Sequence, residues 1–533
     1  MPSSAQAPPA GSQQQQQQQQ PTLKLPKEIA DHYARHGVES VEEYLVGADD
    51  GSTTATCRFV RLNPRYDKEE TLSLLRKEVA ACPCTSTANN DAAVNNNNST
   101  RNPSSSPFPL AVPWLNDRLG FYALPAEFGL ARSECFQTGR VYGMDISSGA
   151  AVAALLYDDH DVKNQQKSKK RDIAVDQEEK EVNDEDAAGL RVLDLCCSPG
   201  LKLCAISDLL SSDSTVVGVD ISESRISLCK KIIIKYQINR QTSGSCTTST
   251  STGSAKDKDD ENRARIRLYC QDGTQFGLAS FRDPDKLVFD SDIAREDEHV
   301  VAGKRKRMNK SARARQQKRL RTVAHLDFMD SATQKDGREV GGDQGAEEEQ
   351  SICTHLFDRV LVDAECSTDG AIKHLKHKLK QEQGNADGND TQAASALSKS
   401  GISKLGDEGA MADLVDLQQR LIASGFRLLK RGGTLVYSTC SLSEEQNEGV
   451  VNWLLQQRSD AYIIPVSFDA SSDGNGDTKK ENFLISEGTI AGTVRFRPKL
   501  HYPSNKGDNG SNSCSEDALL YGGGFWLAKL GKR

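Results

Sequence analysis

Hydrophobic positions along this chain alternate between short continuous runs and longer stretches with helical spacing. The stretch 191–195 predicts a buried strand, Pro199 and Gly200 interrupt it with a turn, and the apolar positions of 203–210 predict a helix. A strand, a tight glycine turn and a helix open a doubly wound nucleotide-type site, whose ligand lies at the carboxyl end of the strand. An ordinary strand–turn–helix of some other α/β protein shows the same pattern.

The alternation of strands and helices continues over about 190–460. Further strands are predicted at 215–220, 266–273, 355–366 and 432–440, and helices at 226–238, 413–429 and 443–457, the last opened by Ser443. The helix at 413–429 is expected to face the sheet with Leu414, Leu417, Leu421, Phe426 and Leu428. Final antiparallel strands are predicted at 495–498 and 522–529. The fold class is therefore α/β, with a doubly wound, Rossmann-like domain over 190–533.

A smaller α+β module is predicted over 26–156. Helical spacing at 29–44 and at 69–79 flanks a strand at 57–62. Trp114 and Phe121 are expected core aromatics.

Two stretches of this module carry more specific expectations. A strand and a turn over 139–149 lead into an apolar helix, which Ser147 or Ser148 is expected to cap. The run 58–65 (RFVRLNPR) interleaves arginines with apolar residues. That pattern is typical of a strand that contacts phosphate with one face, and equally of a strand with a solvated edge.

Low-complexity and strongly charged segments separate these elements. Only 36% of the 533 residues are hydrophobic and 6% are aromatic, which is low for a chain folded along its whole length. Disordered tails, linkers or insertions are predicted at 1–25, 84–107, 157–189, 241–262, 283–350, 383–408 and 469–482. The folded material then amounts to one large domain and one smaller module.

The net charge of −8 gives no global nucleic-acid signature, so such binding must come from local patches. Lys304–Arg307 and a second group formed by Lys318, Arg319 and Arg321 are typical of a nuclear-localisation or RNA-contacting segment, and also of a solvated charge run. No apolar run approaches the roughly 20 residues of a membrane span. With no secretory or Arg-rich leader, the sequence predicts a soluble intracellular protein of the nucleus or nucleolus, otherwise of the cytoplasm.

The fourteen cysteines include no C-x-x-C pair, so we expect no metal site. Because no secretory signal is found, we expect reduced thiols. The glycine turn lacks both phosphate fingerprints, G-x-G-x-x-G and G-x-x-x-x-G-K-[ST]. The expected ligand therefore carries an adenosine without a diphosphate, and S-adenosylmethionine fits. Asp220 lies about 20 residues beyond the turn, where such sites place an acid on the ribose hydroxyls. Asp272 ends the next strand and is a candidate for the adenine amino group, although an acid there is often a turn former or N-cap.

Two cysteines, Cys366 and Cys440, end predicted strands on the cofactor side, and Asp363 precedes the first of them. Cytosine is electron-poor at carbon 6, so a thiolate that adds there makes carbon 5 a nucleophile toward a methyl sulfonium. This scheme needs a nucleophilic cysteine, an acid at the pyrimidine edge and a group that assists release. The alternative is that both cysteines are inert core residues, a common fate of cysteine.

Three motifs in order, 194–202 (DLCCSPGLK), 363–370 (DAECSTDG) and 437–442 (YSTCSL), resemble the Nol/Nop/Sun (Fmu-type) RNA cytosine carbon-5 methyltransferases. The segment 139–148, Gln446-Asn447-Glu448 and the late Gly-Gly-Phe extend the resemblance over about 55–530.

The resemblance implies a role for each matching residue. Cys440 is the nucleophile, Cys366 assists release, and Lys202 and Asp363 contact the cytosine and line the methyl-donor site. The implied cofactor contacts are Cys196, Cys197, Ser198, Pro199, Gly200, Leu201, Lys202, Asp220, Arg225, Asp272 and Asp363. The implied partner is an RNA, with ribosomal or transfer RNA favoured, bound by a monomer through the segment before about Leu156.

Four positions depart from the family's pattern. Leu201 stands where a second glycine is usual, Thr368 where a glycine is usual, and Gln446 where a glutamate is usual. Glu365 replaces a proline and is expected to raise the pKa of the neighbouring Cys366 thiol. Leu201 and Glu365 keep open a cofactor-binding but inactive RNA-assembly scaffold. A methyltransferase of exocyclic nitrogen is disfavoured, because the tetrapeptide Asn/Asp-Pro-Pro-aromatic is missing.

Overall fold

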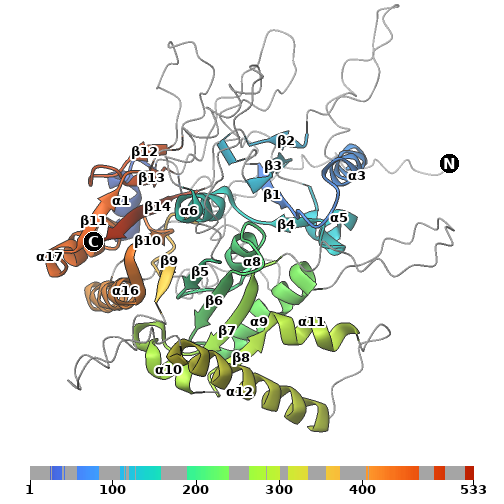
Figure 1. Ribbon diagram of the computed structural model, residues 1–533. Helices are drawn as coiled ribbons and strands as arrows, with labels where there is room; N and C mark the ends of the chain where they lie inside the picture. The colour runs from blue at the N-terminus through green and yellow to red at the C-terminus, as the bar shows by residue number, and fades with distance from the viewer. Residues whose placement is uncertain are drawn as a thin grey trace, which may run out of the picture.

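A mixed sheet forms the centre of the large domain. The computed structural model describes residues 25, 27–38, 41, 57–82, 108–112, 114–115, 119–125, 128–157, 189–238, 263–283, 285–299, 310–333, 356–372, 404–405, 407–466, 468, 485–497 and 523–533. Its strands are β5 (Arg191–Asp194), β6 (Thr215–Asp220), β7 (Arg265–Cys270), β8 (Leu287–Asp290), β9 (Phe357–Asp363), β10 (Leu429–Thr439), β11 (Ala461–Ile464), β12 (Ile485–Glu487), β13 (Val494–Phe496) and β14 (Phe525–Lys532). They lie in the order β12-β13-β14-β10-β9-β5-β6-β7-β8, with β11 paired to β14 (Figure 1).

The middle of this sheet is parallel, from β10 through β9, β5 and β6 to β7. The outer strands are antiparallel, with β8 against β7 and β14 against β10. The predicted doubly wound α/β class is confirmed, and the C-terminal strands are antiparallel as expected.

Alternate residues of each central strand enter opposite hydrophobic cores, as the continuous apolar runs predict. Val192 packs with α6 (Ile146–Leu156), α8 (Leu201–Ser207) and α9 (Glu223–Ile233), the last followed by a π-helical turn at Ile234–Ile238. Leu193 packs on the other face with α10 (Leu278–Arg282), α12 (Lys310–Thr333), α16 (Glu408–Leu428) and α17 (Glu448–Gln457).

A second sheet forms the predicted N-terminal module. Its strands lie in the order β2-β3-β1-β4, all antiparallel, and are β1 (Arg58–Leu62), β2 (Leu110–Ala111), β3 (Phe121–Leu124) and β4 (Val141–Gly143). The amphipathic helix α3 (Lys68–Ala80) packs on it, while η3 (Leu130–Arg132) and α5 (Glu134–Gln137) lead into β4. Because β1 is paired on both sides, it is not an edge strand. Arg61 of the arginine-rich run is 2% exposed and pairs with Asp208, so it is a structural residue.

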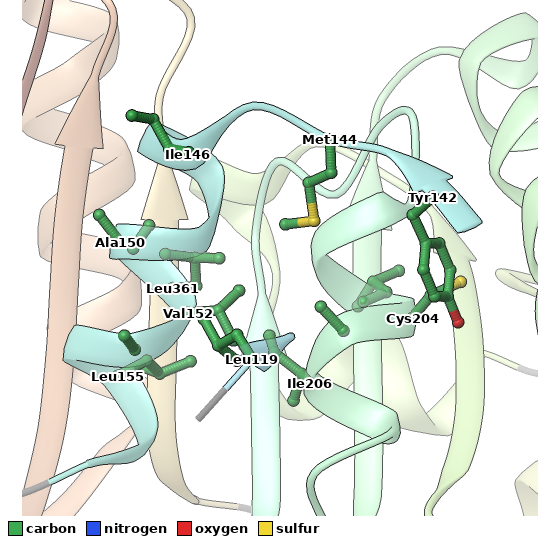
Figure 2. Packing of buried hydrophobic residues seen from close by; sticks show 14 of the residues in the cluster. Leu119, Tyr142, Met144, Ile146, Ala150, Val152, Leu155, Cys204, Ile206 and Leu361 are labelled. Carbon is green, nitrogen blue, oxygen red and sulfur yellow. The ribbon is translucent and has the colours of Figure 1, made fainter. Parts of the chain in front are cut away.

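Two N-terminal helices lie outside the module that the sequence predicts for them. α6 packs on the large sheet, and Figure 2 shows its Val152 among Leu361 of β9 and Ile206 of α8. The cap of α6 is Asp145, which accepts from the backbone N–H of Ile146 at 2.9 Å, so the expected Ser147 or Ser148 cap is wrong. α1 (Lys27–Arg35) lies beside the C-terminal strands, away from α3 (Figure 1).

Two further expectations change in the large domain. The interval 283–350, expected to be a polar insertion, contains β8, α11 (Ser291–His299) and α12, because the apolar Leu287, Phe289 and Leu320 are buried there. α17 begins at Glu448 with Asn447 as N-cap, so Ser443 does not open it. The other expected tails and insertions lie almost entirely outside the described residues. None of the helices within the described ranges is long and apolar enough to cross a membrane.

Candidate active site

The two cysteines of interest meet where β9 and β10 end side by side. Ser438 pairs with Asp363 in this parallel ladder, and the backbone N–H of Ala364 donates to the carbonyl of Ser438 at 3.0 Å. The segments that continue from both strands therefore start at the same height on the sheet. Their thiols, Cys366 and Cys440, lie with 3.0 Å between the Sγ atoms, and both cysteines are free.

A lysine and a hydroxyl hold the carboxylate beside these thiols. Nζ of Lys202, in the first turn of α8, donates to Oδ2 of Asp363 at 2.6 Å. Oγ of Ser438 donates to Oδ1 of the same carboxylate at 2.6 Å. Burial opposes the charged ammonium, but the carboxylates of Asp363 and Asp194 outweigh it and raise the pKa of Lys202. Lys202 and Asp363, both candidate site residues, thus form an ion pair, and Lys202 and Ser438 hold the Asp363 carboxylate from two sides.

The environment keeps the Cys440 thiol protonated. Its hydrogen bond with Cys366, its burial and the charges of Asp363 and Asp369 together raise the pKa of Cys440 well above the usual thiol value. A thiol is a weak nucleophile, so attack by Cys440 requires that its proton be taken at that moment.

The predicted loop 196–200 follows β5 and leads into α8. Gly200 has φ of +101°, and a Cβ there would lie 3.2 Å from Cα of Cys229, so glycine is required. Cys197 is buried with its Sγ 3.9 Å from that of Cys229, whereas Cys196 and Ser198 are half-buried and Pro199 is exposed. Leu201 is the first residue of α8 and is half-buried.

Asp194, which ends β5, was missed by the sequence analysis as a site residue. Its carboxylate is 1% exposed and accepts from the backbone N–H of Cys196 at 3.2 Å. Burial is the main cause that raises the pKa of Asp194 to about 7, against the attraction of Lys202. Its position before the glycine turn was the available signal.

Of the two predicted adenosine-binding acids, Asp220 ends β6 and Asp272 follows the end of β7 by two residues. Asp220 accepts from the backbone N–H of Ser222 at 3.0 Å, and Nε of Arg225 lies 3.2 Å from its Oδ2. Oδ1 of Asp272 accepts from both the N–H and the hydroxyl of Thr274 at 2.9 Å, so Asp272 is the N-cap of η6 (Gly273–Gln275). The structural alternative for Asp272 is thereby confirmed for one of its oxygens.

The remaining motif residues form a buried polar network behind the cysteines. Oε1 of Gln446 accepts from the backbone N–H of Ser367 at 3.0 Å, and its Nε2 donates to the Ser367 hydroxyl at 2.8 Å. The Thr439 hydroxyl donates to Asn447 at 2.5 Å. Glu448 receives both a bidentate contact from Arg495 at 2.7 Å and the indole N–H of Trp526 at 3.0 Å. These residues hold the segment after Cys440 in place.

Glu365, the departure beside Cys366, is directed away from the thiols. Its side chain is 55% exposed and pairs with Lys404 at 3.1 Å. Its backbone carbonyl accepts from Gln418 of α16 at 2.7 Å. The expected effect of Glu365 on the Cys366 thiol stays a prediction.

No group of three or more His, Cys, Asp or Glu side chains suited to a metal ion occurs among the described residues.

The sequence did not indicate Asp369 and His32 as site residues, although Nε2 of His32 lies 2.7 Å from Oδ2 of Asp369. Asp369 lies inside the motif 363–370, but His32 precedes it by 337 residues and has no motif around it.

Comparison with known proteins gives a family match in the C-terminal part of the chain. A family model described as 16S rRNA methyltransferase RsmB/F matches residues 393–504. Ribosomal RNA small subunit methyltransferase F of Shewanella piezotolerans is 39% identical over 106 residues, 20% of this chain and 17% of that protein. Methyltransferase F of Aliivibrio fischeri is 30% identical over 181 residues, 33% of this chain and 31% of that protein. The chain thus spans less than a third of the length of these relatives.

Among solved structures, NSun6 from Pyrococcus horikoshii with SFG is similar, with a TM-score of 0.43 and 13% identity over 95% of this chain and 98% of that one. A methyltransferase homolog protein from the same organism has a TM-score of 0.40 and 16% identity, covering 96% of this chain and 100% of that one.

Proposed function

Because residues 393–504 match the RsmB/F methyltransferase family model and the chain's motifs resemble the Nol/Nop/Sun family, we propose that the protein transfers a methyl group from S-adenosylmethionine to carbon 5 of a cytosine in RNA. One observation carries the proposal: the thiols of Cys366 and Cys440 lie 3.0 Å apart beside the Lys202–Asp363 pair. Inert core cysteines do not need a charged pair next to them, and burying a charged pair costs free energy. A thiol nucleophile that acts on an electron-poor base uses the cysteines together with the charged pair.

Each residue takes one role in this reaction. Cys440 adds through Sγ to carbon 6, and its proton passes by way of the Asp363 carboxyl group to ring nitrogen 3. Lys202 and Ser438 orient that carboxyl group at the pyrimidine edge. When bound, S-adenosylmethionine supplies the methyl group as an electrophilic sulfonium. In the release, Cys366 as a thiolate takes the proton from carbon 5, the electrons of that C–H bond re-form the C5–C6 double bond, and the S–C6 bond breaks, while the departing Cys440 sulfur recovers its proton from ring nitrogen 3.

The residues at the ends of β5, β6 and β7 fit an adenosine-containing donor. Asp220 keeps carboxylate lone pairs beyond its hydrogen bond with Ser222, and these suit ribose hydroxyls. Ile221 follows it with 68% of its surface exposed, an unusual exposure for isoleucine that a flat ring would cover. Oε1 of Gln271 is buried and has no hydrogen-bond partner among the described residues, so it is available to an amino group.

We assign the presentation of RNA to the small sheet β2-β3-β1-β4 with α3. A base within a stack cannot reach a half-buried thiol at the end of a strand, so the target cytosine must be splayed out of a single-stranded region. A second element has to hold the flanking nucleotides while this happens. Ribosomal or transfer RNA and a monomeric enzyme remain part of this proposal.

A cofactor-binding scaffold without turnover is the second candidate. Leu201 at the start of α8 supports it, because a side chain replaces the usual glycine beside the donor site. The scaffold hypothesis requires that Cys440→Ala leave every function of the protein intact.

The experiment is trapping of the covalent adduct. Purified Cys366→Ala protein is incubated with S-adenosylmethionine and total RNA and is then run on a denaturing gel. We expect a slow RNA-bound band that disappears in the Cys366→Ala/Cys440→Ala double variant and persists in Cys366→Ala/Cys270→Ala, where Cys270 is a half-buried cysteine at the end of β7. Absence of the band, together with absence of methyl transfer by the wild type to any RNA fraction, favours the scaffold.

Nuclear residence is proposed from the basic clusters alone. Lys304–Arg307 lies outside the described residues. In the second cluster, on α12, Arg319 pairs with Glu296 and Arg321 with Asp285. These pairs leave the first cluster as the better candidate signal. Imaging of a fluorescent fusion with Lys304–Arg307 changed to alanine tests the assignment.

A further inference from the structure

A buried carboxylate behind the thiols links the two cysteine segments. Asp369 lies three residues after Cys366 and is fully buried. Its Oδ2 accepts from the backbone N–H of Leu442, two residues after Cys440, at 2.9 Å. Its Oδ1 accepts from the hydroxyl of Ser367. One side chain thus fixes the backbone that follows both cysteines.

Other contacts between the same segments depend on this arrangement. The Ser367 hydroxyl lies 3.0 Å from the Ser441 hydroxyl, and the N–H of Gly370 donates to the carbonyl of Cys440 at 2.9 Å. A Cβ on Gly370 would lie 2.8 Å from that carbonyl and 2.4 Å from the carbonyl of Gly524, so the approach tolerates only glycine. These contacts join the segments that follow Cys366 and Cys440.

The turn that carries Asp369 is strained. Thr368 has φ of +57°, a left-handed conformation that β-branched residues rarely adopt. Such a conformation persists only where the surroundings over-determine it. The bonds made by Ser367 and Asp369 on either side of Thr368 supply that constraint.

Helix α1 completes the network from far away in the sequence. Nε2 of His32 lies 2.7 Å from Oδ2 of Asp369, and both side chains are buried. Burial alone disfavours the Asp369 carboxylate, but the hydrogen bonds from His32, Ser367 and Leu442 lower its pKa, so Asp369 is an acceptor and His32 the donor. The hydroxyl of Tyr33 donates to the backbone carbonyl of Asp369 at 2.9 Å. Two consecutive residues of α1 therefore hold the same residue of the strained turn.

We propose that His32 is a positioning residue for the reaction: through Asp369 it sets the relative placement of the Cys366 and Cys440 thiols. The inference rests on the proposed function for its kinetic consequence, but not for its geometric one. Without the imidazole, Asp369 is a buried charge that has lost one of its donors. The carboxylate then reorients or takes up a proton, and its bonds to Ser367 or Leu442 change with it.

Two substitutions of His32 and one control separate positioning from folding. His32→Leu removes the donor, and His32→Gln keeps an N–H donor near the place of Nε2. His36→Gln is the control, because His36 directly follows the last residue of α1 and its ring packs against His32 with 4.6 Å between centroids. Unfolding by urea reports whether each variant of the full chain is folded.

The first readout needs no RNA. Diamide accepts two electrons and two protons from Cys366 and Cys440 as they form a disulfide, and peptide mass spectrometry follows the rate. We expect His32→Leu to change this rate by about tenfold or more, since small misplacements of reacting atoms have effects of this size or larger. His32→Gln and His36→Gln should remain within about threefold of the wild type. An unchanged rate in a folded His32→Leu protein overturns the proposal.

The second readout is kinetic. His32→Leu should lower kcat for methyl transfer by about ten- to a hundredfold, with KM for S-adenosylmethionine unchanged and kcat recovered in His32→Gln. An equal loss of kcat in His32→Gln and His32→Leu contradicts the proposal, because the N–H donor that His32→Gln retains then does not support the reaction. If the wild type methylates no RNA, the proposed function fails, while the diamide rates still decide the role of His32.

Discussion

Arg61 of the small sheet and Asp208 at the end of α8 form an ion pair with 2.6 Å between N and O, and both side chains are buried. The pair attaches the N-terminal module to the large domain. Removing one partner leaves the other as an uncompensated buried charge, which costs about 3–5 kcal/mol. We predict that Arg61→Met lowers the free energy of unfolding in urea by this amount.

The control for Arg61→Met is an exposed pair of the same kind. Arg420 and Asp416 lie one turn apart on α16 at 2.8 Å, and both are more than half exposed. Arg420→Met should change the stability by less than about 1 kcal/mol, because solvent screens such pairs. Equal effects of the two substitutions on the free energy of unfolding would show that burial does not increase the contribution of the Arg61–Asp208 pair.

Lys202→Met is predicted to lower kcat of methyl transfer by about 10²-fold or more, since Asp363 loses the ammonium that orients it. Lys430 provides a matched control, because it pairs with Asp358 at 2.8 Å near the opposite end of β9. Lys430→Met should leave kcat unchanged. Comparable losses in both variants would attribute the effect to the sheet and not to the site.

Stability should fall with rising pH because of Asp194. Burial raises its pKa from 3.8 to about 7 in the folded protein, a change worth about 4 kcal/mol. Below about pH 4 the group is protonated in both states and costs nothing. From there to about pH 7 the unfolded chain releases the proton first, so the folded state loses stability, and above pH 7 the loss is complete.

Urea unfolding at several values of pH between 4 and 8 checks this prediction. Asp194→Asn cannot ionise, so its stability should vary less over this interval by about 4 kcal/mol. Parallel pH profiles for the wild type and Asp194→Asn would refute the assignment.

Thr368→Gly should stabilise the protein by up to about 1 kcal/mol, because glycine adopts the left-handed conformation without strain. Thr368→Ala is the companion variant, since alanine keeps a Cβ and hence most of the strain. Stabilisation by alanine equal to that by glycine would point to the threonine side chain and not to φ as the cause.

The exposed face of α12 should contribute to RNA affinity. Lys310, Arg313, Arg315 and Lys318 are all exposed there. For Arg315→Gln/Lys318→Gln we expect weaker RNA binding and a salt dependence whose log–log slope falls by about one for each phosphate that is no longer neutralised. The comparison variant is Lys430→Gln/Arg431→Gln at the start of β10, and the measurement is a binding titration at several salt concentrations. An unchanged slope would show that the exposed basic side chains of α12 do not contact RNA phosphates.

The sequence predicted the parts of the fold that follow from local pattern. The apolar runs at 215–220 and 355–366 became β6 and β9, and the strict spacing at 413–429 became α16 with Leu414, Leu421 and Phe426 buried. The carboxyl ends of parallel strands lie at the same edge of a sheet, so the sequence alone predicted that Asp363, Cys366 and Cys440 belong to one site.

What the sequence could not predict depends on contacts between distant segments. β8 has only four residues (Leu287–Asp290) and α12 is polar along most of its length, so neither has a strong local pattern, although Phe289 and Leu320 are buried. His32 has no local feature that points to Asp369. The role of Asp272 is ambiguous in the sequence, because acids after strands cap turns in some proteins and contact ligands in others.

The strand that delivers Cys440 is completed by residues that follow every other described element in the chain. β10 has β9 on one side, and on the other β14, whose Phe525–Ala528 are buried. During biosynthesis β10 is therefore an open edge until residues 525–532 have been translated, and an open edge invites pairing with other chains. A premature stop codon anywhere before residue 525 should thus behave as a null allele and yield aggregated protein, although it leaves Lys202, Asp363 and both cysteines encoded intact.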